Sequence, residues 1–68
     1  MDKKIIYYSR NHDNYITITS NNNATVYTHY KNDAPVKTTF NKYAFIEYLK
    51  GTTVPNKYRK EVESHGVL

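Results

Sequence analysis

The chain has 68 residues with no cysteine, and its ten basic and six acidic side chains give a formal net charge of +4. This length predicts a single domain over residues 1–68 with a thin hydrophobic core. The absence of cysteine excludes disulfides and thiolate zinc sites. No apolar run approaches the roughly 20 residues of a membrane span, and the N-terminal segment turns polar at Ser9, too early for a signal peptide. We therefore expect a cytoplasmic protein.

Patterns of period two and polar turns in the first forty residues predict a small antiparallel β-meander of three to four strands. Strict alternation makes residues 15–19 the clearest strand, with Ile16 and Ile18 on one face. Asparagine-rich turns separate the strands, because Asn tolerates the left-handed backbone of tight hairpins. Pro35 lacks an N–H, so the last strand should begin after it or lie at an edge. The expected strands span residues 3–8, 15–19, 24–30 and 36–40.

The period then changes to about 3.6 residues, which predicts two short helices. Asn41 can cap the first, over residues 43–50, and a glycine follows its end. Pro55 suits the first turn of the second helix, which should run to about His65. Both helices are expected to cover one face of the sheet. The predicted fold class is therefore α+β, a β-meander followed by two C-terminal helices.

Strand parity decides which side chains the sheet presents to solvent. We expect the aliphatic residues Ile16, Val26 and Val36 to turn towards the helices. The opposite face then carries Tyr15, Tyr27, His29, Lys37 and Thr39. Tyr7 joins that face if Ile6 points inward. Tyr is enriched at protein interfaces because it buries a large area at a low entropic cost. The residues predicted to bind a partner are Tyr15, Tyr27, His29 and Tyr30, with Lys31 and Lys37 at the rim.

No arrangement of residues in the sequence predicts catalysis or metal binding. The three histidines fall in a turn, a strand and a helix end, without a second ligand at a useful spacing. Two acidic residues, Asp13 and Asp33, lie in turns, and Glu61 and Glu63 are spaced two apart on a helix, where they do not face each other. No serine lies in a nucleophile elbow, and no glycine-rich loop is present to hold phosphate. We expect no enzymatic activity, no cofactor and no metal.

These observations favour a non-catalytic protein-interaction module. Asn, Lys and Thr are as frequent as the eight tyrosines, and the abundance of residues with A/T-rich codons indicates a low-GC genome. Short chains of this composition are common among the accessory genes of phages and mobile elements. The expected function is to bind a host protein and to inhibit or modulate it, as anti-defence proteins such as anti-CRISPRs do.

Four alternatives accompany this hypothesis. A Tyr platform ringed by Lys and Arg can stack bases and hold phosphates, so the same face would suit a small basic nucleic-acid-binding or regulatory protein. Tyr and Thr are also favoured in strands without any ligand. The two helices resemble a helix-turn-helix in spacing, although Glu61 and Glu63 would then meet phosphate. The fourth alternative is a homodimer formed through an edge strand.

Overall fold

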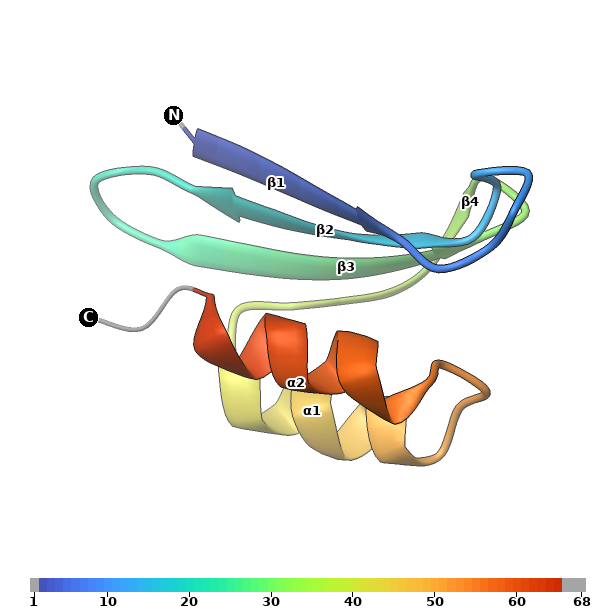
Figure 1. Cartoon of the computed structure of the whole chain (residues 1–68). Helices are drawn as coiled ribbons and strands as arrows, with labels where there is room; N and C mark the ends of the chain where they lie inside the picture. Colours follow the sequence, from blue (N-terminus) through green and yellow to red (C-terminus); the bar gives the residue numbers. More distant parts are fainter. Residues whose placement is uncertain (1, 66–68) are drawn as a thin grey trace.

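The computed structural model describes residues 2–65 and contains four strands followed by two helices (Figure 1). The strands are antiparallel neighbours in the order β1-β2-β3-β4, so the predicted α+β meander is confirmed. The elements are β1 (Asp2–Tyr7), β2 (Tyr15–Ser20), β3 (Thr25–Lys31), β4 (Ala34–Thr39), α1 (Lys42–Lys50) and α2 (Asn56–Ser64).

The two helices run antiparallel to each other on one face of the sheet and leave the other face open (Figure 1). This confirms the prediction that both helices cover the same face. Within residues 2–65, no helix has the length and apolar character that crossing a membrane requires. The core lies between the two layers and consists of Ile6, Ile16, Ile18, Tyr27, Phe45, Ile46, Leu49, Val54 and Val62.

Local sequence explains where the helices begin and end. Asn41 Oδ1 accepts a hydrogen bond from the Ala44 backbone N–H at 3.0 Å, which satisfies one of the free donors in the first turn of α1. The Gly51 N–H donates to the Tyr48 carbonyl at 3.1 Å, where α1 ends. Pro55 precedes α2 and needs no N–H partner at that position.

The turn between β2 and β3 fixes the register of the sheet. Ser20 pairs with Thr25 across the loop 21–24, and the Asn21 side chain accepts hydrogen bonds from two backbone N–H groups of this loop at 2.8 and 2.9 Å. Because the loop has an even number of residues, even-numbered positions of β2 oppose odd-numbered positions of β3. The odd-numbered side chains of β3 therefore share a face with the two isoleucines of β2.

The predicted facing of residues 24–30 is therefore wrong. Tyr27 and His29 pair with the two isoleucines of β2 and lie beneath the helices, with exposed fractions of 2% and 4%. Val26, which was expected in the core, lies on the open face. The predicted facing was based on Val26, the one aliphatic residue of β3. The Tyr27 ring has the larger apolar surface, and it stacks on Phe45 with 5.7 Å between ring centroids.

A β-bulge reverses the predicted facing of β4 as well. A tight turn with positive φ at both central residues joins β3 to β4, and the register then shifts so that Val36 is the extra residue. Lys37 pairs with His29 and Thr39 with Tyr27, so Lys37 and Thr39 lie on the helix side, not on the open face as predicted. Val36, which was expected to point inward, is 54% exposed.

The adjacent residues Tyr27 and Val26 provide a test of this register. Tyr27→Ala removes a ring from the core and should lower the free energy of unfolding by about 3 kcal/mol or more. Val26→Ala, on the open face, should cost about 1 kcal/mol or less. Urea unfolding followed by circular dichroism measures both changes. A larger loss for Val26→Ala than for Tyr27→Ala would show that the register is wrong.

Candidate functional site

The open face of the sheet carries a row of stacked aromatic rings from three strands. Tyr7, Tyr15 and Tyr30 lie opposite one another in the registers of β1, β2 and β3. The ring centroids of Tyr15 and Tyr30 are 4.7 Å apart, with 19° between the ring planes. Tyr7 meets Tyr15 edge to face at 5.4 Å, and His12 stacks on Tyr7 at 4.4 Å. These four residues form the aromatic row.

The turn between β1 and β2 positions His12 at the end of the aromatic row. Ser9 Oγ donates a hydrogen bond to the Asp13 carboxylate at 2.9 Å and accepts one from the Asn14 backbone N–H at 3.2 Å. The His12 backbone N–H donates to the Ser9 carbonyl at 3.2 Å. His12 itself has a φ of 60°, in the left-handed region, and this compact turn brings its ring against Tyr7.

The open face carries very little charge. Lys3 is the one charged residue among the strand positions that the pairing places there. Partial burial raises the pKa of Tyr15, and the neighbouring Asp33 carboxylate raises this pKa further, so the Tyr15 hydroxyl keeps its proton as a donor at neutral pH. The strand residues on this face are Lys3, Ile5, Tyr7, Tyr15, Thr17, Thr19, Val26, Thr28, Tyr30, Pro35 and Thr38.

The structure brings together two of the six predicted contact residues. Tyr15 and Tyr30 belong to the aromatic row, and Tyr7 joins them as expected, because Ile6 is buried on the helix side. Sequence reasoning missed His12, since nothing in the sequence predicted that the turn would fold its ring onto Tyr7. The other four predicted residues lie elsewhere: Tyr27 and His29 beneath the helices, Lys31 exposed at the end of β3, and Lys37 on the helix side of β4.

Beneath the helices, two tyrosine hydroxyls hold His29 from both sides. The Tyr8 hydroxyl oxygen lies 2.5 Å from His29 Nε2, and the Tyr48 hydroxyl oxygen lies 2.6 Å from Nδ1. Burial lowers the pKa of His29, and the positive charge of Lys31 lowers it further. A neutral imidazole has one N–H donor and one acceptor nitrogen, so one hydroxyl accepts and the other donates. We call this arrangement the histidine clamp.

The histidine clamp links separate parts of the fold. Both ring nitrogens have hydrogen-bond partners within the chain, which fixes the orientation of the imidazole. A hollow of about 270 Å³ lies beside the clamp, and no carboxylate lines it. The clamp connects β3 to α1 through Tyr48 and to the segment after β1 through Tyr8. The hollow is lined by Tyr8, His29, Lys31, Val36, Tyr48, Gly51, Thr52 and Thr53.

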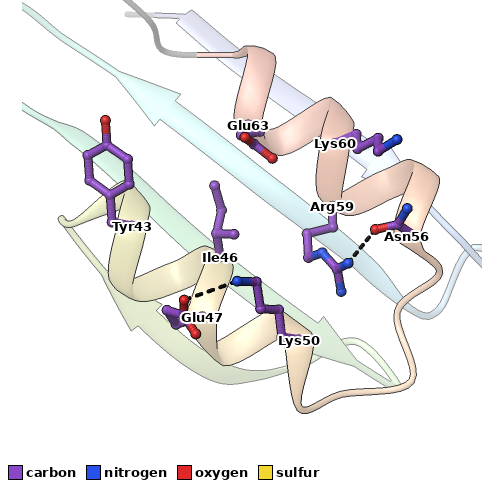
Figure 2. A pocket seen from close by; sticks show the side chains of 8 residues that line it. All are labelled: Tyr43, Ile46, Glu47, Lys50, Asn56, Arg59, Lys60 and Glu63. Carbon is purple, nitrogen blue, oxygen red and sulfur yellow. Dashed lines mark hydrogen bonds and ion pairs between the residues drawn. The ribbon is translucent and has the colours of Figure 1, made fainter.

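A second hollow, of about 350 Å³, lies on the outer side of the helix layer between α1 and α2 (Figure 2). Its lining is mostly charged or amide-bearing, whereas ligand pockets are mostly apolar. Glu47 already pairs with Lys50 at 3.1 Å, and Arg59 donates to the Asn56 side chain. Among residues 2–65, no group of three or more His, Asp or Glu side chains is placed to hold a metal ion.

Comparisons with family models, with curated proteins and with solved structures found no match. Three features described above bear on a functional inference. The histidine clamp is buried and internally satisfied, and the groove between the helices is polar and partly paired within itself. Within residues 2–65, the aromatic row lies on a face that no helix or loop layer covers, which makes it the candidate functional site (Figure 1).

The histidine clamp predicts a pH-dependent stability. The pKa of His29 in the folded chain is below the unfolded value of about 6.5, so the unfolded chain binds more protons as the pH falls through this region. The free energy of unfolding should therefore be highest above about pH 6.5 and should decrease as the pH falls towards the folded pKa. Urea unfolding between about pH 7.5 and pH 5.5 measures this change.

Two glutamine variants test whether His29 causes this pH dependence of the free energy of unfolding. His29→Gln keeps a neutral polar side chain and should remove most of the pH dependence over this range. His12→Gln changes the exposed turn and should retain it. If His29→Gln lost stability on acidification as steeply as the unmodified chain, the histidine clamp would not be the origin of the effect.

Proposed function

We propose that this chain is a non-catalytic protein-interaction module that binds its partner through the open face of the sheet. The aromatic row is the observation that carries the proposal, because it presents stacked tyrosines on a face with one charged strand residue. Centres of protein interfaces are enriched in Tyr and depleted in charged residues. Tyr7 and Ile5 are 43% and 37% exposed and offer apolar area to a partner.

The distribution of charge favours a protein partner over a nucleic acid. Binding to single strands needs Lys or Arg beside the stacking rings, because phosphate neutralisation supplies much of the affinity. Here Lys4 and Lys37 lie on the helix side of the sheet, and the Asp33 carboxylate lies beside Tyr15. A phosphate backbone would meet a negative charge at the centre of the row. A nearly neutral protein surface with exposed apolar and hydrogen-bonding groups fits this face better.

Composition supports a finer form of the proposal, in which the chain is an accessory protein of a phage or mobile element that inhibits or modulates a host protein. A module without catalytic groups acts by occupying the surface that it covers. Tyr is suited to this role because it has few side-chain torsions to immobilise on binding. Stacking within the aromatic row restrains the rings before the partner arrives, which lowers the entropic cost of binding further.

Tyr30→Ala tests the proposed binding face, with Tyr43→Ala as its matched control. Tyr30 lies in the aromatic row, whereas Tyr43 is 79% exposed on α1, in the helix layer. Immobilised chains are incubated with nuclease-treated lysate of a low-GC bacterium, and retained proteins are identified by mass spectrometry. Proteins retained by the unmodified chain and by Tyr43→Ala should be lost with Tyr30→Ala, because central tyrosines often contribute about 2 kcal/mol or more to binding.

Salt dependence separates the proposal from its main alternative. Labelled single-stranded DNA and RNA are titrated with the unmodified chain at low and at physiological salt. We expect no specific shift at physiological salt, whereas phosphate binding would weaken steeply and linearly on a log–log plot as salt rises. Tight nucleic-acid binding with that slope, lost in Tyr30→Ala and retained in Tyr43→Ala, would contradict a protein partner for this face.

A further inference from the structure

The two edges of the sheet differ in how they are protected against pairing with another strand. The β4 edge contains Pro35, which has no N–H, and the bulge at Val36. In contrast, β1 pairs with β2 in an unbroken register from Asp2 to Tyr7 and contains neither a proline nor a bulge. A regular edge strand with free backbone groups is a template for pairing with another chain.

The hydrogen-bond pattern of β1 indicates which backbone groups at this edge have no partner among residues 2–65. The Tyr8 N–H donates to the Asn14 carbonyl at 3.1 Å, and this pair continues the register of β1 with β2. Hydrogen-bonded pairs alternate with non-hydrogen-bonded pairs in an antiparallel ladder, so the even-numbered residues of β1 bond to β2. The N–H and C=O groups of Lys3, Ile5 and Tyr7 therefore point away from the sheet.

We propose that the β1 edge pairs with β1 of a second copy of this chain, antiparallel and about a two-fold axis at Ile5. In this register Ile5 lies opposite Ile5 of the second copy, Lys3 opposite Tyr7, and Lys4 opposite Ile6. The free groups of Lys3, Ile5 and Tyr7 meet the same groups of the second copy. Each hydrogen-bonded pair then exchanges two bonds. This inference does not rest on the proposed function.

The charges of β1 select this register over its neighbours. The open faces of the two joined sheets lie on the same side only when the two-fold axis passes through a residue of β1. The candidate centres are therefore Lys3, Lys4, Ile5 and Ile6. An axis at Lys3 or at Lys4 places that lysine directly opposite itself, and like charges in that position are destabilising. An axis at Ile6 pairs fewer strand residues. The axis at Ile5 pairs residues 3–7 with residues 3–7 and places no lysine opposite a lysine.

The proposed contact also covers apolar area that the single chain exposes. Ile5 and Tyr7, two of the exposed large hydrophobic residues among residues 2–65, both lie on β1. Ile5 would be covered by Ile5 of the second copy, and the Tyr7 ring would pack against the aliphatic stem of Lys3 of the second copy. The two sheets would join into one, with all helices on one side. Because one strand from each copy forms the contact, it belongs to the class of small, weak interfaces below about 1,200 Å².

A single-cysteine variant tests the register directly, because the chain contains no cysteine of its own. In Ile5→Cys the two thiols face each other across the axis, so mild oxidation should give a disulfide-linked dimer on a non-reducing gel. Val36→Cys lies on the opposite edge and is the more exposed position, 54% against 37%, so it should stay mostly monomeric. Equal cross-linking at the two positions would indicate random collision and would overturn the proposal.

The mass of the unmodified chain in solution provides the second test. Sedimentation equilibrium should show a mass that rises towards that of a dimer between micromolar and millimolar concentration. Ile5→Lys puts like charges on the axis and should raise the dissociation constant about fivefold or more, whereas Val36→Lys should leave it unchanged. Amide hydrogen exchange of Lys3, Ile5 and Tyr7 should slow as concentration rises. A strictly monomeric mass at millimolar concentration would overturn the proposal, whether or not the open face binds a protein.

Discussion

The pairing of β2 with β3 is the constraint on which the remaining structure depends. These two strands are central in the sheet, so their register sets which side chains face the helices and which face solvent. A shift by one residue would exchange the faces of β3, bringing Val26 beneath the helices and Tyr27 and His29 into solvent. The sheet would then lose both the stacking of Tyr27 on Phe45 and the hydrogen bond between His29 and Tyr48, two contacts that hold α1 against it.

The same register divides the aromatic side chains into two groups with different roles. On the covered side, tyrosine hydroxyls satisfy a buried histidine, and buried polar networks rigidify a fold when every member has a partner. On the open side, the tyrosines protect the sheet in place of a second layer. Thr17 and Thr28 lie on the open face, yet they are only 5% and 8% exposed, because neighbouring side chains of the sheet shield them. The open face is thereby a packed surface as well as a candidate interface.

The positions of the basic side chains bear on both proposals. The lysines of β3 and β4 and the basic residues of the helices lie away from the centre of the aromatic row, which leaves a nearly neutral face for a protein partner. The two lysines of β1 stand at the free edge, where they disfavour most self-pairing registers and permit one. A small chain with a thin core gains stability from any contact that covers exposed apolar area, by mass action.

The sequence by itself determined the elements, their order and the fold class, because these follow from local signals: the alternation of residues 15–19, the capping Asn41 and the helix-compatible Pro55. It also placed Tyr15 correctly on the open face, whereas Tyr30 reached that face because the predicted facing of β3 was reversed. Tertiary structure decided the facing of β3 and β4, since loop length and the bulge at Val36 set the register and leave no mark in hydrophobic periodicity. The histidine clamp could not be predicted from the sequence either, because its two hydroxyls come from residues 21 and 19 positions away from His29 along the chain.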